Sequence, residues 1–156
     1  MRDDSRNDDF SASAAKNTPP YLKADQLPWT PWVMEGLAFK LISVDLSTGG
    51  FSLFLRVDPG AQIPTHGHIG SVEGIVLSGS FTFDNEVSEK GDFFFDYGGS
   101  LQQPVSKEGC TLFLSASGPL VAYNADTDTT VVIDARRVYD IAKEAGMADH
   151  ITPVFT

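Results

Sequence analysis

The sequence predicts an all-β domain, a sandwich or barrel of short strands, with one short helix near the C-terminus. From Leu37 onward, apolar or alternating stretches recur at intervals of about 8–12 residues, a spacing typical of such folds. Turn residues, among them Gly49-Gly50, Pro59-Gly60 and Gly98-Gly99, separate these stretches. A single helical pattern, near residue 140, follows the last of them.

The strands are expected, in order, at 37–45, 51–58, 71–78, 80–84, 92–95, 110–116, 119–124 and 129–135. A helix is expected at 136–145, because Val138, Ile141, Ala142 and Ala145 follow the i, i+3, i+4, i+7 pattern of one apolar face. Gly146 is a natural C-terminal stop for it.

The length of 156 residues indicates one domain. Residues 1–20 are small, polar or charged and end in Pro19-Pro20, so we expect a flexible N-terminal arm there. Residues 21–156 form the predicted single domain. Hydrophobic residues make up 42% of the chain, enough to build a core.

The charge balance narrows the classes of partner. The chain has 11 Lys and Arg against 21 Asp and Glu, a net charge of −10, which argues against nucleic acid and anionic lipid as partners. No apolar run approaches the roughly 18 residues of a membrane span, so we expect no membrane association. The polar N-terminus and the lone Cys110 favour a cytoplasmic protein.

Two of the three histidines, His66 and His68, are the first candidates for chemistry. Alternate residues of a strand point to the same face, so both imidazoles can converge on one metal ion. The alternative is a polar strand end on which two histidines happen to fall.

The surrounding stretch, PGAQIPTHGHIGSVEGIVLSG, resembles the first cupin motif, G-x5-H-x-H-x(3,4)-E-x6-G. Downstream residues stand at the spacing of the second motif, G-x5-P-x-G-x2-H-x3-N, namely Gly91, Tyr97, Gly99, Gln102 and Ser106. With both motifs in order on a background of strands, the domain is identified as a cupin, which implies a single jelly-roll barrel.

LPWTPW at 27–32, MEGLAFK at 34–40 and GPLVAY at 118–123 extend the resemblance to two families of small cupin oxygenases. These are the 2,4'-dihydroxyacetophenone dioxygenases and the acetylacetone-cleaving enzymes, and the similarity covers roughly residues 25–146. It implies a mononuclear non-haem Fe(II) ion bound by histidines, and cleavage of a carbon–carbon bond next to a carbonyl by O2.

This sequence departs from the family pattern at two ligand positions. Gln102 replaces the histidine of the second motif, and its carbonyl oxygen is a weaker donor for Fe(II). Counted back from Gly79, the glutamate position falls on Val72, so on a regular strand Glu73 would face away from the metal unless a bulge corrects it. Glu86 matches the place of an extra glutamate in the dihydroxyacetophenone enzymes. Glu73 and Glu86 both stay open as ligands, whereas the third histidine, His150, fits better as a solvated tail residue.

Three further residues are candidates for catalytic roles. By position Asp96 resembles a glutamate that lies behind the metal ligands of the acetylacetone-cleaving enzymes, and it could orient Gln102 or cap a turn. Tyr97 could donate a hydrogen bond to a substrate carbonyl oxygen or pack at a strand end. Arg56 could reach an anionic substrate group or pair with a surface carboxylate. Cys110 is expected to be a buried, unreactive thiol.

The leading functional expectation is a dioxygenase with one divalent metal ion, Fe(II) favoured and Zn(II) possible, held by His66, His68, Glu73 or Glu86, and Gln102. Its substrate would be a small hydroxyketone or β-dicarbonyl, aromatic by preference because the chain holds 11 Phe. The alternatives are a redox-inert metal lyase or isomerase of a carbonyl compound and a non-catalytic cupin that binds a small molecule. We also expect a homodimer, with the segment 29–32 as a candidate contact.

Overall fold

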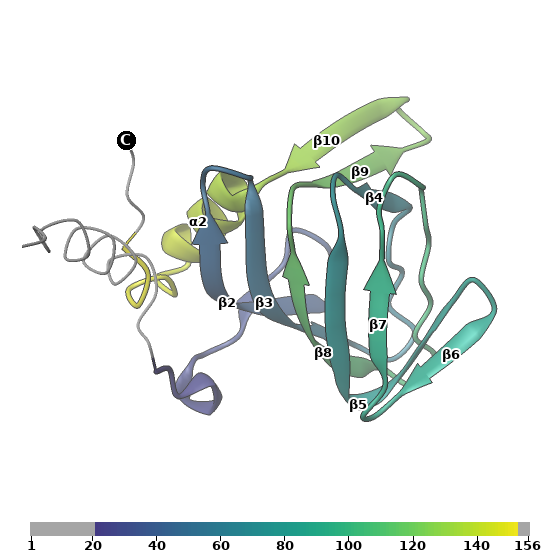
Figure 1. The fold of residues 1–156 in the computed structure, drawn as a ribbon, viewed down its shortest axis with the longest axis horizontal. Coiled ribbons are helices and arrows are strands. Elements are labelled where there is room, and N and C mark those ends of the chain that lie inside the picture. Colours follow the sequence, from purple (N-terminus) through teal and green to yellow (C-terminus); the bar gives the residue numbers. More distant parts are fainter. Residues whose placement is uncertain (1–20, 153–156) are drawn as a thin grey trace, which may run out of the picture.

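The computed structural model describes residues 21–152 and forms two β-sheets with a C-terminal helix (Figure 1). The flexible arm expected at 1–20 lies outside the described residues, as do residues 153–156. The elements in chain order are η1 (Ala24–Gln26), β1 (Thr30–Pro31), β2 (Leu37–Asp45), β3 (Gly50–Val57), β4 (His66–His68), β5 (Val72–Phe83), β6 (Glu86–Glu89), β7 (Phe93–Asp96), β8 (Cys110–Ala116), β9 (Leu120–Asn124), β10 (Thr129–Ile133) and α2 (Ala135–Glu144).

The larger sheet has the strand order β1-β2-β3-β8-β5-β6, with β7 also paired to β5. The smaller sheet has the order β10-β9-β4. All pairings are antiparallel. Because successive side chains of a strand point to opposite faces, each strand of the larger sheet presents alternate side chains inward and outward. In Figure 1 the smaller sheet lies over one end of the larger one. The predicted all-β fold with a short C-terminal helix is confirmed.

Most predicted strands are present, and β2 and β8 begin and end at the predicted residues. The predicted strands 71–78 and 80–84 are instead one strand, β5, so the turn expected at Gly79 is wrong. The register against β8 shifts between Val76 and Ser78, and Gly79 has a φ of +69°. A β-bulge accommodates the irregular backbone, which lets the strand continue through the glycine.

Strand β6 was not predicted, although a local signal for it exists. Asp84 and Asn85 have φ values of 49° and 65°, so they form a two-residue turn with both residues in the left-handed region. Such turns favour Asn and Asp and match the twist of a hairpin. The turn folds β6 back onto the end of β5, where Glu86 pairs with Phe83.

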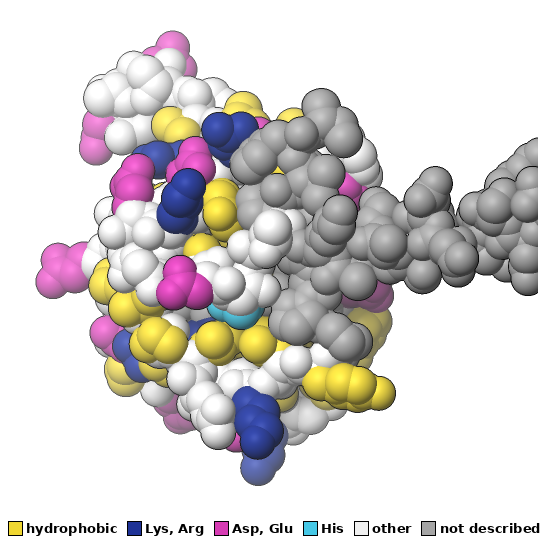
Figure 2. Space-filling model, turned by 90° about the vertical axis from the view of Figure 1, so that its left-hand side faces the viewer, with side chains coloured by type: hydrophobic (Ala, Val, Ile, Leu, Met, Phe, Trp, Pro, Cys, Tyr) yellow, Lys and Arg dark blue, Asp and Glu magenta, His cyan; other side chains and the backbone are white. Residues whose placement is uncertain are grey.

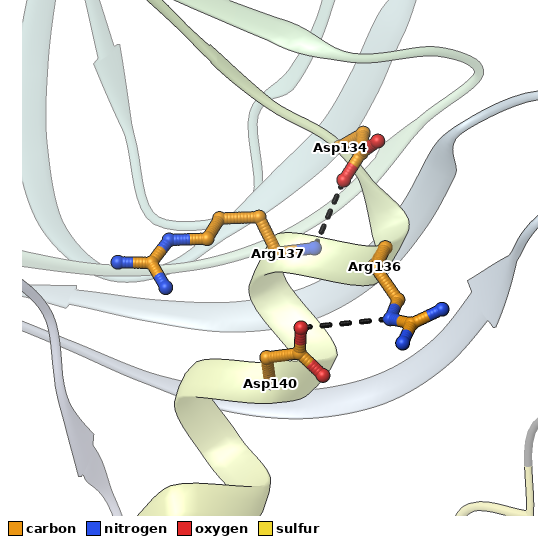
Figure 3. Close-up of polar contacts among 4 residues, drawn as sticks. All are labelled: Asp134, Arg136, Arg137 and Asp140. Carbon is orange, nitrogen blue, oxygen red and sulfur yellow. Dashed lines mark hydrogen bonds and ion pairs between the residues drawn. The ribbon is translucent and has the colours of Figure 1, made fainter.

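Helix α2 covers the β2–β3 end of the larger sheet and closes the main core. Asp134 caps the helix by accepting a hydrogen bond from the Arg137 backbone N–H at 2.9 Å, and Arg136 Nε lies 3.5 Å from Asp140 Oδ2 one turn along (Figure 3). The apolar face of α2 packs with the inner side chains of both strands. The most deeply buried members of this core are Phe39, Leu41, Ala135, Val138 and Ala142.

The chain after α2 also packs on this core. Ala148 and Ile151 are buried, and the His150 Nε2 lies 2.6 Å from the carbonyl oxygen of Leu41 on β2. The expectation that His150 is a solvated tail residue is therefore wrong. Apolar residues on both sides of it dock on the sheet and carry the histidine with them.

The described surface carries dispersed charge and several exposed apolar side chains. On the face shown in Figure 2, acidic and basic side chains stand among hydrophobic ones. Among residues 21–152 no helix is long and apolar enough to cross a membrane.

Candidate metal centre

A cavity of about 150 Å³ opens beside the inner face of the larger sheet, at the end that α2 leaves uncovered. Its walls are mostly apolar and come from the middle of the larger sheet, chiefly Leu55, Val57, Phe81, Phe83, Phe94, Leu112 and Leu114. Its polar lining comes from side chains with donor or acceptor atoms, namely His66, His68, Glu86, Ser88, Asp96 and Gln102. Such a combination, an apolar pocket with a few polar groups, is typical of a small-molecule site.

The two histidines occupy the first and last positions of β4, which pairs with β9. Their rings lie with centroids 5.4 Å apart and nearly perpendicular planes. A Cβ on Gly67 between them would lie 2.9 Å from the Ser100 carbonyl oxygen. The His-Gly-His sequence thus places two imidazoles on one face and lets the segment that carries Gln102 cross close behind.

The imidazole of His66 is oriented by the backbone. Its Nδ1 lies 2.9 Å from the carbonyl oxygen of Pro64, an acceptor, so Nδ1 carries the proton and donates it. That tautomer leaves Nε2 as the free acceptor, the form in which a neutral histidine binds a metal.

His68 differs, because its buried Nδ1 has no hydrogen-bond partner among the described residues. Burial, with a smaller effect of nearby His66, lowers the pKa of His68 to about 4, and Asp96 acts in the opposite direction. His68 is therefore neutral near pH 7. An unpartnered buried nitrogen is unfavourable by itself and calls for an explanation.

Gln102 lies directly opposite His66 on a neighbouring extended segment. The two residues exchange both backbone hydrogen bonds, with N···O distances of 2.8 and 2.6 Å. Side chains of such a pair project to the same face with Cβ atoms roughly 5.5 Å apart. The structure thus brings Gln102 to the histidine pair, as the second motif led us to expect.

Asp96, at the end of β7, holds the amide of Gln102. Its Oδ2 accepts a hydrogen bond from Gln102 Nε2 at 2.5 Å, and its Oδ1 accepts one from the Gly98 backbone N–H at 2.9 Å. The two alternatives for Asp96, orienting Gln102 and capping the turn, are thus both realised in one carboxylate. Gly98 has a φ of +82°, which allows the sharp turn after the strand.

The two glutamates lie on opposite sides of the sheet. Glu86, on β6, lines the cavity while remaining exposed. Glu73 is exposed on β5, on the face opposite its cavity-lining neighbour Val72. The bulge in β5 lies beyond Val76, past Glu73, and so does not turn that side chain inward.

Arg56 and Tyr97 do not line the cavity. The guanidinium of Arg56 lies over the ring of Trp29, 4.8 Å from its centroid, on the other face of the sheet. Tyr97 is 86% exposed and packs edge-to-face on Phe95. The structure therefore brings His66, His68, Gln102, Asp96 and Glu86 to one cavity and leaves Glu73, Arg56, Tyr97 and His150 outside it.

Sequence reasoning missed two features of the site. The Pro64 carbonyl that orients His66 is a backbone group and leaves no side-chain signal. Cys110 is a buried free thiol, as expected, but it also forms part of the cavity wall. Burial raises the pKa of this thiol, against a hydrogen bond to Ser106 that lowers it.

The donor set is unusual for a metal site. Within residues 21–152, no three His, Cys, Asp or Glu side chains gather closely enough to hold a metal ion. A site at the histidine pair therefore needs a donor of another kind, and the Gln102 amide opposite His66 is such a group. Two imidazoles and an amide oxygen fit a borderline divalent ion.

Comparison with known proteins agrees with this fold. Residues 17–120 match the family described as the ChrR Cupin-like domain. No curated protein sequence matches the chain.

Solved structures of low sequence identity share the architecture. An RmlC-like cupin from Ralstonia eutropha is 22% identical with a TM-score of 0.75, over 92% of this chain and 96% of that one. An acetylacetone dioxygenase from Acinetobacter johnsonii is 13% identical with a TM-score of 0.69, over 80% and 89%. The Rhodobacter sphaeroides complex of SigE with the anti-sigma ChrR matches at 16% identity and a TM-score of 0.52, over 74% and 68%. With a family match over most of its length and the expected jelly-roll fold, this chain belongs to the ChrR cupin-like family.

Proposed function

We propose that this protein is a metal-dependent cupin dioxygenase that cleaves a carbon–carbon bond next to a carbonyl group in a small hydroxyketone or β-dicarbonyl. The proposal has two levels, a metal ion bound at the histidine pair and oxygen chemistry on a carbonyl compound. The oxygen chemistry is supported by the fold that this chain shares with an acetylacetone dioxygenase.

The observation that carries the metal site is the unpartnered Nδ1 of His68 beside the oriented ring of His66. Both imidazoles line the cavity from one face of β4, and a buried polar atom that lacks a partner among the described residues is satisfied when a ligand binds it. We propose His66 and His68 as ligands, with Fe(II) favoured and Zn(II) as the redox-inert alternative. Glu86 also lines the cavity with an exposed carboxylate, but among the described residues it does not form a three-residue metal-binding group with the two histidines.

A divalent ion at this place would supply a Lewis acid for a carbonyl oxygen and, if redox-active, electrons for O2. The protein residues have separate tasks. The apolar walls, including Phe81, Phe83 and Phe94, hold the hydrocarbon part of the substrate and exclude water from it. In the overall reaction one carbon–carbon bond breaks and both oxygen atoms of O2 enter the products.

The cavity volume restricts the substrate. A cavity of about 150 Å³ lined by Leu, Val and Phe matches the size at which an apolar protein cavity holds benzene. We therefore propose a substrate with a single ring or an aliphatic dicarbonyl of similar size.

Oxygen uptake tests this function. Protein loaded anaerobically with Fe(II) is mixed with a panel of small β-diketones and aryl hydroxyketones, and O2 consumption is followed with an electrode. We expect uptake with at least one ketone and its loss in His66→Ala. No uptake across the panel, with iron confirmed in place, would contradict the oxygenase. Turnover that persists without O2 and with Zn(II) would instead identify a redox-inert lyase or isomerase.

A second candidate function is a non-catalytic module that binds a small molecule. The match to the ChrR Cupin-like domain favours it, together with the fold of the anti-sigma ChrR in its complex with SigE. The replacement of the motif histidine by Gln102 is the sequence feature that agrees with it. Ligand binding that raises the melting temperature without turnover would support this function.

The homodimer remains a prediction. In the monomer Trp32 packs edge-to-face on buried Phe39, and Trp29 lies beneath Lys40 and Arg56, so part of the segment 29–32 is already engaged. A molar mass from light scattering distinguishes the two states, and a monomer mass at micromolar concentration would contradict the dimer.

A further inference from the structure

We infer that the third protein donor of this metal site is the amide oxygen of Gln102, and that Asp96 is the positioning residue that turns this oxygen toward the histidines. The inference rests on the metal site proposed above. It concerns the residue at which this chain departs from the cupin motif, so the motif itself does not supply it.

The first step is the placement of Gln102. The backbone of this residue is fixed by two hydrogen bonds with the backbone of His66, and its side chain lies on the same face as the His66 imidazole. Both side chains line the cavity, and His68 lies two residues further on the same face. Three donors from two adjacent extended segments therefore meet at one wall of the cavity.

The second step is the orientation of the amide. A glutamine side chain has a donor end and an acceptor end, whereas an ionised carboxylate accepts only. Asp96 accepts a hydrogen bond from Nε2 of Gln102, and the carboxylate does not contact the Oε1 atom of the same amide. The opposite orientation would direct an N–H toward the site and would repel a cation.

The third step is the rigidity of Asp96. The second oxygen of its carboxylate accepts the Gly98 N–H, and its backbone pairs with Val72 on β5. The carboxylate is thus held from two sides before it meets Gln102. This arrangement is comparable to the carboxylate that orients a metal-bound histidine, with an amide in the place of the imidazole.

Gln103 provides a matched control. Its Nε2 donates to the Ile63 carbonyl oxygen at 3.2 Å, and the residue is exposed and does not line the cavity. Gln103→Leu changes the same chemical group one position away and should leave the metal site intact.

The test is a titration of metal-free protein with Co(II) alone, following both the dissociation constant and the visible Co(II) spectrum. The variants are Gln102→Leu, Gln103→Leu, Asp96→Ala and the double variant Asp96→Ala/Gln102→Leu, each checked for folding by a thermal melt. We expect Gln102→Leu to weaken binding at least tenfold and to change the spectrum, while Gln103→Leu does neither. Asp96→Ala should weaken binding about tenfold, the range known for residues that orient metal ligands.

The double variant decides the role of Asp96. If Asp96 acts through Gln102, its removal in the Gln102→Leu background changes the dissociation constant no further. An equal further loss would show that Asp96 acts directly and would overturn its role as a positioning residue.

Unchanged binding in Gln102→Leu would overturn the assignment of Gln102 as a donor, while binding by the wild type would still support the proposed metal site. Absence of Co(II) binding by the wild type would overturn both proposals. Gln102→His, which restores the motif residue, should tighten binding, and a weaker site in that variant would also count against the inference.

Discussion

The inner face of the larger sheet has two halves that are completed in different ways. At the β2–β3 end, α2 and the segment after it close a dry core in which Phe39, Val138 and Ala142 are fully buried. At the β8–β5 end no helix of residues 21–152 covers the sheet, and the cavity lies there instead. There the buried Nδ1 of His68 has no hydrogen-bond partner in the described part of the chain. The first half is completed by contacts within the chain, whereas the second half holds the cavity at which we propose a metal ion and a ligand bind.

This difference shows how one sheet can serve stability and binding at once. The helix-covered half is packed by apolar contacts that need no further partner. The cavity half keeps apolar walls but adds a few polar side chains to them, among them His66, His68 and Gln102. Mutations should therefore act on stability in the first half and on ligand or metal binding in the second.

The largest expected effect is the loss of an aromatic ring from the helix-covered half. Phe39→Ala removes a fully buried ring that also packs against Trp32, so the free energy of unfolding should fall by about 3–5 kcal/mol. Urea unfolding followed by tryptophan fluorescence measures it. A loss below about 1 kcal/mol would show that this half is not the main core.

The same change in the cavity half should do much less to stability. Phe83 is half-buried and lines an existing cavity, so Phe83→Ala should lower the free energy of unfolding by about 1–2 kcal/mol. It should also allow longer ketones to bind, measured as shifts in melting temperature across a ligand series. Equal losses in Phe83→Ala and Phe39→Ala would remove the distinction between the two halves.

The helix cap is a smaller test of the first half. Asp134→Ala removes the acceptor for the Arg137 N–H, so the free energy of unfolding should fall by about 1 kcal/mol. Asp134→Asn keeps an acceptor oxygen and should recover most of this loss. If neither variant changes the urea midpoint, the cap does not hold the helix on the sheet.

The pH dependence of stability tests the cavity half, because His68 lies there. The pKa of His68 is lowered from 6.5 to about 4, so unfolded protein takes up a proton below pH 6.5 that folded protein resists until about pH 4. The free energy of unfolding of metal-free protein should therefore fall as the pH is lowered through this window. Urea midpoints between pH 7.5 and pH 4 measure the slope, which His68→Gln should reduce. If His68→Gln leaves this slope unchanged, the pH dependence does not come from His68.

Much of the fold could be predicted from local patterns. Alternation and turn residues located β2 and β8 to the residue, and the i, i+3, i+4 pattern located α2 within one residue. The error at Gly79 arose because a glycine in a β-bulge has the same local signature as a glycine in a turn. Strand β6 was missed although Asp84-Asn85 is a recognisable hairpin turn, since the charged residues after it suggested a solvated loop.

Those parts of the candidate site that depend on the alternation of side chains along a strand, or on motif spacing, could be predicted. His66 and His68 share a face by alternation, and the count back from Gly79 already indicated that Glu73 faces away. The hydrogen bond from Gln102 to Asp96 was one of two roles that the family resemblance allowed for Asp96, and the sequence did not decide between them. The contact of His66 with Pro64 joins residues two positions apart, yet it depends on the conformation of the backbone between them. No spacing within the sequence contains that information. The same holds for Arg56, whose stacking on Trp29 joins residues 27 positions apart.

The most direct test of the central claim is the metal content of the protein after anaerobic loading with Fe(II) or Zn(II) and desalting, measured by mass spectrometry. The wild type, His66→Ala and the matched control His150→Gln are compared, because His150 lies on the other half of the sheet and contacts Leu41. We predict close to one ion per chain in the wild type and in His150→Gln, and loss of the ion in His66→Ala. Retention of the ion in His66→Ala, or no retained ion in the wild type, would contradict a metal centre at the histidine pair.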